Sequence, residues 1–247
     1  GYGDVGGLVC RGVGRSVVFN IVDFVLTGVT GVGALRIRCF VPGRAVAYER
    51  LWSRLVLWLF RTICGVRVCV SGLENLPKSG PALIASQHQS AFDTLVWMLL
   101  LPRPCYVMKG ELTRIPLLGP MLVLTGMMPV ERAAGARALR LLLQGADKAA
   151  ADDRQIIIFP EGTRTLPGEH VPLKPGIAAM SSHTGLPVVP VATNSGLFWG
   201  RNAFVKRSGV LHVCIGPSVG PGKRAALLDE IEKSWGVLEP APVLETC

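Results

Sequence analysis

The stretch PALIASQHQSAFDTLVWMLL, residues 81–100, joins a short apolar run, a polar segment and a longer apolar segment. The run Ala82–Ala85 predicts a buried strand, and the pattern over Ala91–Leu101 predicts a helix. The polar segment between them contains His88 and follows the end of the strand. Because ligands of α/β folds bind at the carboxyl ends of strands, this junction is a candidate functional site.

From Gly65 onward, short β-rich runs alternate with helical patterns in the same way. This alternation predicts an α/β domain whose sheet is flanked by helices. The other predicted strands are Val66–Val70, Cys105–Met108, Ile156–Phe159, Val188–Ala192 and Leu211–Ile215, and the other predicted helices are Arg132–Ala151, Gly176–Thr184 and Lys223–Trp235.

The composition is more apolar than that of an ordinary soluble protein. Of the 247 residues, 49% are hydrophobic and only 17% are charged, and the mean hydropathy is +0.42. Disorder is excluded because disordered chains are poor in apolar residues and rich in charge. The length suits one domain, or one domain with a small appendage, and the apolarity favours association with a membrane.

The first long apolar segment, VVFNIVDFVLTGVTGVGAL at residues 17–35, carries a single charge, Asp23. Its 19 residues are close to the roughly 20 that a spanning helix needs. Arg36, Arg38 and Arg44 follow it, which resembles a stop-transfer flank more than the cleavage region of a signal peptide. We predict a membrane anchor, with a signal peptide or a buried hairpin as the alternatives.

A second apolar stretch occupies residues 51–60. On a helix, Arg50, Arg54 and Arg61 fall within about 40° of one another, and leucines with a tryptophan occupy the opposite face. This pattern is typical of a helix that lies in the membrane interface. An ordinary packed amphipathic helix is the alternative.

Positive charge is concentrated in this N-terminal region. The net charge is +9, and residues 1–67 hold nine arginines against three acidic residues. Because the arginines alternate with apolar runs and no aromatic stacking motif appears, an anionic membrane is favoured over a nucleic acid. We therefore divide the chain into membrane-anchoring helices at 1–64 and an α/β domain at 65–247.

His88 and Asp93 are candidates for acid–base chemistry. Their spacing places them about 140° apart on a straight helix, so they meet only if His88 precedes the helix and Asp93 lies in its first turns. Asp93 can then accept the imidazole N–H and leave the other ring nitrogen as a general base. The alternative is structural, because Ser90-Ala-Phe-Asp93 resembles a capping box with Asp in place of Glu.

A second polar segment, FPEGTRT at residues 159–165, follows the predicted strand at residues 156–159. An arginine such as Arg164 binds phosphate through two parallel hydrogen bonds, and backbone N–H groups beside a glycine can add to that site. Taken alone, the segment can also be a polar turn.

Together these segments resemble the glycerolipid acyltransferase family, the bacterial 1-acyl-sn-glycerol-3-phosphate acyltransferases. Four blocks occur in the family's order: His88-xxxx-Asp93, Tyr106 to Arg132, Phe159-Pro-Glu-Gly-Thr-Arg164 and Val188-Val-Pro-Val191. The resemblance implies a mixed α/β sheet flanked by helices, with the N-terminal hydrophobic helices as the membrane anchor.

The resemblance also implies a reaction. His88, paired with Asp93, deprotonates the sn-2 hydroxyl of lysophosphatidic acid, and the alkoxide attacks the thioester of acyl-CoA or acyl-carrier protein. The product is phosphatidic acid. No cofactor other than the acyl donor and no metal is expected.

The family pattern carries over to six substrate-binding residues: Lys109, Arg132, Glu161, Gly162, Thr163 and Arg164. It implies that the three cations bind the substrate phosphate and that residues 161–163 shape the glycerol pocket. Backbone N–H groups near Gly110 or Gly162 are candidates for stabilising the oxyanion.

The acceptor is the open point. The same chemistry on a lyso-ornithine lipid or another lysophospholipid is the alternative reaction, and a non-catalytic lipid-binding protein is the alternative class. The expected location is a membrane, at the cytoplasmic face of a bacterial inner membrane, with membrane lipids and no nucleic acid as partners.

Overall fold

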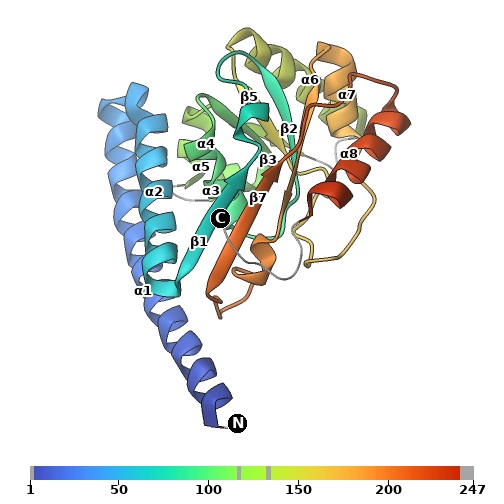
Figure 1. The fold of residues 1–247 in the computed structure, drawn as a ribbon. Helices are drawn as coiled ribbons and strands as arrows, with labels where there is room; N and C mark the ends of the chain where they lie inside the picture. The colour runs from blue at the N-terminus through green and yellow to red at the C-terminus, as the bar shows by residue number, and fades with distance from the viewer. Residues whose placement is uncertain (1–2, 116–117, 132–134, 240–247) are drawn as a thin grey trace.

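The computed structural model describes residues 3–115, 118–131 and 135–239, and within them a seven-stranded sheet forms the centre of the fold (Figure 1). The strands run in the order β1-β7-β6-β2-β5-β3-β4 across the sheet. Their bounds are β1 Val66–Ser71, β2 Ala82–Ser86, β3 Pro104–Lys109, β4 Met128–Val130, β5 Gln155–Ile158, β6 Val188–Thr193 and β7 Gly209–Ile215.

The sheet is mixed, as the family resemblance implies. β6 and β7 pair antiparallel, whereas the other neighbouring strands pair parallel. In the central register Ile84 of β2 lies between Ile157 of β5 and Val189 of β6. Because β6, β2, β5, β3 and β4 run in one direction, the segments that follow them meet at one edge of the sheet.

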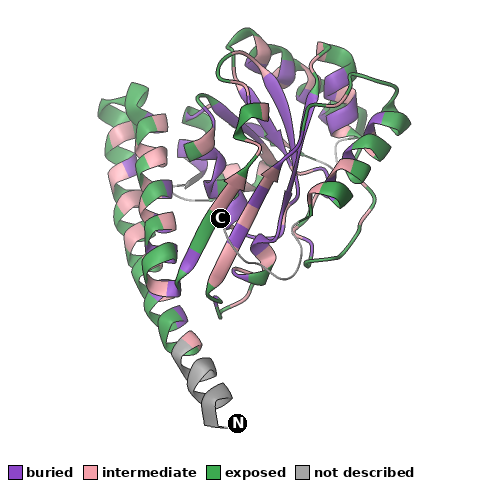
Figure 2. Cartoon of the chain, in the orientation of Figure 1, coloured by how far each residue is buried: buried purple, intermediate pink, exposed green. Residues whose placement is uncertain are grey.

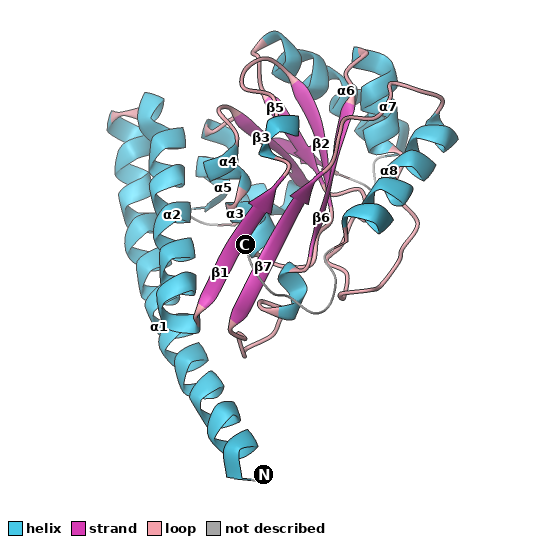
Figure 3. Ribbon diagram, viewed as in Figure 1, coloured by secondary structure: helices cyan, strands magenta, loops and turns pink. Residues whose placement is uncertain are grey.

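Helices cover both faces of this sheet (Figure 3). Their bounds are α1 Gly3–Phe40, α2 Ala45–Cys64, α3 Phe92–Leu95, α4 Trp97–Leu100, α5 Leu118–Leu124, α6 Gly135–Ala151, α7 Gly176–Thr184 and α8 Arg224–Leu238. Successive residues of a strand point to opposite faces, so Leu83 packs with α6, α7 and α8, while Ile84 packs with α2, α3 and α4.

The six predicted strands are confirmed, and three details differ. The helix predicted over Ala91–Leu101 is divided into α3 and α4 by a turn at Val96. β4 and α5 were not predicted, because three residues and seven residues are too short for a clear periodicity. The predicted start of α6 at Arg132 lies outside the described residues.

The N-terminal region forms a helical hairpin beside the sheet (Figure 1). α2 lies between α1 and the sheet and buries Val56 and Phe60 in the same core as Ile84. The far side of α1 is apolar and exposed (Figure 2). Residues Gly12–Phe40 are long and apolar enough to cross a membrane, with a mean hydropathy of 1.7 and only 11% of the most apolar window buried.

Candidate active site

The segments that follow β2 and β5 form the candidate site at the shared edge of the sheet. His88 lies two residues beyond β2, and Asp93 is the second residue of α3. His88 Nδ1 lies 3.4 Å from Asp93 Oδ2. The Asp93 side chain is buried at 2% exposure, whereas the His88 side chain remains 16% exposed. The aspartate is therefore shielded from water, and the imidazole keeps one accessible side.

Asp93 also organises the backbone of this turn. Its Oδ2 accepts the N–H groups of Gln89 at 2.7 Å and Ser90 at 2.8 Å. The Ser90 hydroxyl in turn accepts the N–H of Phe92 at 3.0 Å. The capping interpretation and the pairing with His88 are thus both present, and they share one carboxylate oxygen.

Only one tautomer of His88 can donate a hydrogen bond across this contact. An ionised carboxylate can only accept, so a hydrogen bond between the two side chains requires the proton on Nδ1. Nε2 then carries a lone pair and can accept a proton from a substrate. The ring is further restrained by Phe159, which stacks on it with the ring centroids 4.1 Å apart and the planes 20° apart.

The turn after β5 is built by its own sequence. The Gly162 N–H donates to the Phe159 carbonyl at 3.0 Å, which closes a four-residue turn with Pro160 at its second position. Gly162 has a φ of 76°, a conformation that strongly favours glycine. Because the Gly162 N–H donates within the turn, the backbone N–H groups of the neighbouring residues are the remaining candidates for an oxyanion donor in this segment.

Glu161 joins the two segments. Its Oε2 accepts the His88 backbone N–H at 2.6 Å, and its Oε1 accepts the Thr165 hydroxyl at 2.9 Å. The Thr165 N–H donates to the His88 carbonyl at 2.8 Å. Glu161 and Thr165 therefore hold the His88 backbone from both sides.

The environment of Glu161 disfavours its charged form. Burial raises the pKa of Glu161 to about 7, and the Asp93 and Glu169 carboxylates add to the increase. The hydrogen bonds from His88 and Thr165 act in the opposite direction. Both oxygens of Glu161 are engaged with the protein, so its role visible in the structure is to support the histidine.

Two of the three predicted phosphate-binding cations, Lys109 and Arg164, are described, and both lie at or beyond the ends of strands that finish at the same edge of the sheet. Lys109 ends β3 and is exposed, and Arg164 is half-buried in the loop after β5. Among the described residues, neither side chain has a hydrogen bond or ion-pair partner. Arg132 lies outside the described residues. Thr163 is exposed between Gly162 and Arg164.

Sequence reasoning missed two residues at this site. Thr165 follows the last residue of the third family block, and its role depends on a contact with His88 that is distant in sequence. Arg201 donates from Nη1 to the Arg164 carbonyl at 3.2 Å and brings a further guanidinium to this loop. The segments of His88 and Thr165 meet because β2 and β5 are neighbours in the sheet.

A histidine–aspartate pair at the edge of a mixed sheet, beside a loop whose arginine side chain has no partner among the described residues, is a site suited to base-assisted transfer to an anionic acceptor. Residues 67–194 match the acyltransferase family model. The chain is 33% identical to the 1-acyl-sn-glycerol-3-phosphate acyltransferase of Pseudomonas aeruginosa over 228 residues, which cover 90% of this chain and 88% of that protein. The chain therefore belongs to the acyltransferase family.

Two other similarities agree with this assignment. The human 1-acyl-sn-glycerol-3-phosphate acyltransferase alpha is 32% identical over 158 residues, which cover 64% of this chain and 56% of the human protein. The crystal structure of the 1-acyl-sn-glycerophosphate acyltransferase of Thermotoga maritima superposes with a TM-score of 0.78 at 20% identity. That superposition covers 97% of this chain and 100% of the other, so the two proteins share one fold.

The contacts of Thr165 give a first prediction. Thr165→Val keeps the backbone N–H but removes the hydroxyl that bonds Glu161, so we expect kcat for acyl transfer to fall roughly 10-fold with little change in KM. The free energy of unfolding is expected to fall by about 1–3 kcal/mol, since the carboxylate loses a partner. Steady-state kinetics and chemical denaturation measure both quantities.

Two further variants separate positioning from general destabilisation. Thr165→Ser keeps the hydroxyl and is expected to restore kcat. Thr184→Val removes a hydroxyl that bonds the Met180 carbonyl in α7, away from the site, and is expected to leave kcat unchanged. An unaltered kcat in Thr165→Val, or equal losses in Thr165→Val and Thr184→Val, would contradict a positioning role.

Proposed function

We propose that this protein is a 1-acyl-sn-glycerol-3-phosphate acyltransferase that converts lysophosphatidic acid and an acyl thioester into phosphatidic acid. The observation that carries the proposal is the contact of the partly exposed His88 with the buried Asp93, beside the Arg164 loop. The names of the relatives from Pseudomonas aeruginosa and Homo sapiens support this acceptor. The thioester is acyl-CoA or acyl-carrier protein, and the proposed reaction uses no other cofactor.

The proposed chemistry is a direct transfer. His88 Nε2 takes the proton of the sn-2 hydroxyl as its oxygen attacks the thioester carbonyl. The tetrahedral intermediate collapses, the carbon–sulfur bond breaks, and the imidazolium returns the proton to the thiolate that leaves. Asp93 keeps the other proton on Nδ1 and stabilises the imidazolium. A positioned general base such as His88 typically raises the rate by roughly 10²–10⁴-fold.

The substrate phosphate needs cations, because lysophosphatidic acid carries up to two negative charges near neutral pH. We propose Arg164 as the main phosphate ligand, with Lys109 and Arg132 as additional cations. The half-buried position of Arg164 and its lack of a partner among the described residues support this assignment. We propose that Glu161, Gly162 and Thr163 shape the glycerol pocket. Glu161 contributes by holding the backbone of His88 in place.

Arg164→Ala is expected to raise the KM for lysophosphatidate about 10- to 100-fold with a smaller change in kcat, since a bidentate charged pair is lost. The measurement is acyl transfer in detergent over a range of acceptor concentrations. Arg224→Ala, a matched change at the start of α8, serves as the control and is expected to leave KM unchanged. An unchanged KM in Arg164→Ala would remove this residue from the phosphate site.

A competition between acceptors tests the proposed substrate. Purified protein is given labelled acyl-CoA or acyl-carrier protein together with lysophosphatidate, a lyso-ornithine lipid and lysophosphatidylcholine. We expect labelled phosphatidate as the main product, and its formation to be the reaction most sensitive to Arg164→Ala. Transfer only to another acceptor would retain the chemistry but overturn the substrate. Binding of these lipids without any transfer would favour a lipid-binding protein.

We also propose that the hairpin lies in one leaflet of the membrane, rather than α1 crossing it. Two contacts near the middle of α1 support this: the Lys206 backbone N–H donates to Ser16 Oγ at 2.8 Å, and the Asn20 side chain donates to the Phe204 carbonyl at 3.0 Å. Further along α1, the Tyr48 hydroxyl of α2 donates to the Thr30 carbonyl at 2.8 Å, which holds the two helices of the hairpin together. Because the contacts of Ser16 and Asn20 with the loop before β7 lie inside the apolar segment Gly12–Phe40, α1 cannot cross a bilayer without drawing that loop into it.

The exposed face of α1 makes this location testable. Phe24 is 80% and Val29 is 66% exposed, and their joint change to glutamate is expected to release the protein from vesicles into the soluble fraction. Val237→Glu changes an 87% exposed residue of α8 and serves as the control that stays bound. Vesicle flotation measures the bound fraction. Because acyl-CoA and acyl-carrier protein are cytosolic, we propose the cytoplasmic face of a bacterial inner membrane as the location.

A further inference from the structure

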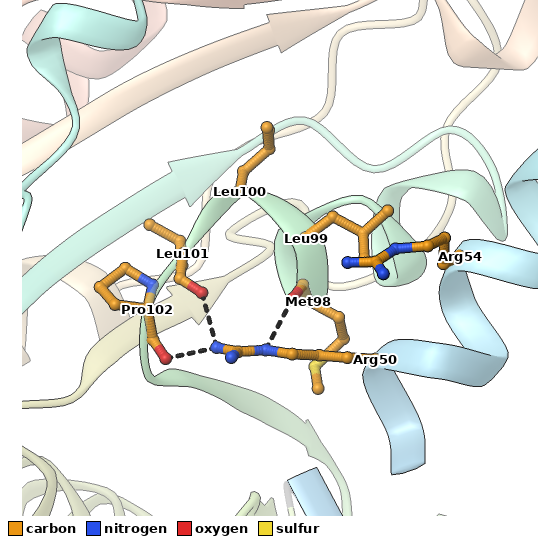
Figure 4. A pocket seen from close by; sticks show the side chains of 7 residues that line it. All are labelled: Arg50, Arg54, Met98, Leu99, Leu100, Leu101 and Pro102. Atoms are coloured by element: carbon orange, nitrogen blue, oxygen red, sulfur yellow. Dashed lines mark hydrogen bonds between the residues drawn. The ribbon is translucent and has the colours of Figure 1, made fainter. Parts of the chain in front are cut away.

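A cavity lies outside the His88 site, between α2 and the end of α4 (Figure 4). Its volume is about 250 Å³. The described residues that line it are two arginines of α2, Arg50 and Arg54, and the segment Met98–Pro102. None of these lining residues is acidic, so the cavity is positively charged.

Arg50 is held in place by the protein itself. Its Nε donates to the Met98 carbonyl at 3.1 Å, and its Nη2 donates to the Leu101 carbonyl at 3.0 Å and to the Pro102 carbonyl. These bonds attach α2 to the end of α4 and fix the guanidinium at the wall of the cavity (Figure 4). Nη1 of Arg50 has no partner among the described residues.

Arg54 has a different situation, although it is only one helical turn further along α2. Its side chain extends toward Leu99 on the other wall of the cavity (Figure 4). Within the described part of the chain, its guanidinium has no hydrogen bond and no ion pair. Residues four apart share one face of a helix, so Arg54 and the free Nη1 of Arg50 present donors to the same space.

The surroundings of Arg54 favour a lipid over a soluble anion. On the exposed side of α2, Arg54 lies between Leu51, which is 50% exposed, and Trp58, which is 58% exposed. Leu99 on the opposite wall is 37% exposed. Exposed apolar side chains on both sides of Arg54 can meet acyl chains, while the guanidinium stays at the level of the phosphate groups.

We propose that the cavity between α2 and α4 binds the phosphate of an anionic membrane phospholipid, with Arg54 as the bidentate ligand and Arg50 as the fixed wall of the site. The apolar residues around the opening accommodate the adjoining acyl chains. This site is distinct from the acceptor site at His88, and it rests on the membrane location proposed for the hairpin. It would hold the catalytic domain in one orientation on anionic membranes.

Charge-conserving substitutions test this proposal against general attraction. Arg54→Lys keeps the positive charge but loses the planar fork that binds two phosphate oxygens. Arg61→Lys makes the same change on the same helix at an exposed position outside the cavity. Binding is measured by flotation with phosphatidylcholine vesicles that contain or lack phosphatidylglycerol.

We expect the wild type to bind more tightly to vesicles that contain phosphatidylglycerol. On these vesicles the affinity of Arg54→Lys is expected to be about 5- to 10-fold lower than that of the wild type, and the affinity of Arg61→Lys to be unchanged. Equal binding by both variants would overturn the proposal and leave only general electrostatic attraction. Displacement by inorganic phosphate, beyond that caused by chloride at equal ionic strength, would overturn the lipid as occupant.

The test of the proposed reaction is independent of the test of this lipid site. Acyl transfer in detergent is expected to be unchanged in Arg54→Lys, because the cavity lies beside the segment that enters the start of β3, whereas His88 follows the carboxyl end of β2. If the wild type binds neither kind of vesicle, the membrane location and the lipid site are both wrong, while the proposed reaction is decided by the detergent assay. If the wild type binds both kinds equally, only the lipid site is wrong.

Discussion

His88→Ala is expected to lower kcat for acyl transfer by roughly 10²–10⁴-fold, the contribution of a positioned general base. In the proposed reaction, the imidazole is the group that takes the hydroxyl proton while the thioester is attacked, so its removal should slow this step. The fold is expected to persist, because the side-chain contacts of His88 are those with Asp93 and the Phe159 ring. Initial rates with a labelled acyl donor measure the effect, and circular dichroism checks the fold.

The structure offers a matched control for this variant. His183 Nε2 lies 2.9 Å from Asp147 Oδ2 on the surface formed by α6 and α7, so the molecule contains another histidine–aspartate pair. Both side chains of that pair are exposed. His183→Ala is therefore expected to leave kcat unchanged. Near-normal turnover in His88→Ala would remove this histidine from the role of base.

Asp93→Asn is expected to produce the second large effect, a fall in kcat of the order of 10²-fold or more with little change in KM. Asparagine keeps the size of the side chain and an oxygen that accepts the N–H groups of Gln89 and Ser90. It removes the negative charge that stabilises the imidazolium, and its amide group can favour the wrong tautomer of His88. Kinetics and thermal unfolding on the same samples measure the two effects.

The two interpretations of Asp93 make different predictions here. If Asp93 acts only as a helix cap, Asp93→Asn and Asp93→Ala lower stability in proportion to lost hydrogen bonds, and kcat per folded molecule is retained. If it also supports His88, Asp93→Asn loses kcat while the unfolding midpoint changes little. Retained kcat in Asp93→Asn would therefore leave the cap as its only role.

Much of this arrangement is predictable from the sequence. The central strands are continuous apolar runs because they are buried on both faces, and these runs predict β2, β5 and β6 closely. The five-residue spacing of His88 and Asp93 permits their contact only if the histidine precedes the helix, as it does in the structure. The spacing alone left a helix cap as the alternative, and the family resemblance implied the pair. Local periodicity therefore suffices for the strands but not for the pair.

The support of the histidine is not predictable in the same way. Glu161 and Thr165 lie more than seventy positions from His88 in the sequence, and they meet it only because β5 pairs with β2. The family resemblance implied that Glu161 shapes the substrate pocket, and the structure adds that its oxygens bond the His88 backbone and the Thr165 hydroxyl. Strand order, which no local pattern encodes, decides this point.

The hairpin shows a similar limit. An apolar run at residues 17–35 predicts a membrane helix, and α1 extends well beyond it at both ends. The sequence left open whether the helix spans or lies in the membrane, because both need the same apolar residues. The contacts of Ser16 and Asn20 with the loop before β7 favour the second arrangement, and they join segments about 190 residues apart.

The central claim is base-assisted acyl transfer to lysophosphatidate at His88. The most direct test incubates wild-type protein and His88→Ala in detergent with labelled acyl thioester and lysophosphatidate, and quantifies labelled phosphatidate by mass spectrometry. The account predicts phosphatidate from the wild type, and at most about one-hundredth of that rate from the folded variant. Equal amounts of phosphatidate from both proteins, or none from a folded and lipid-binding wild type, would contradict it.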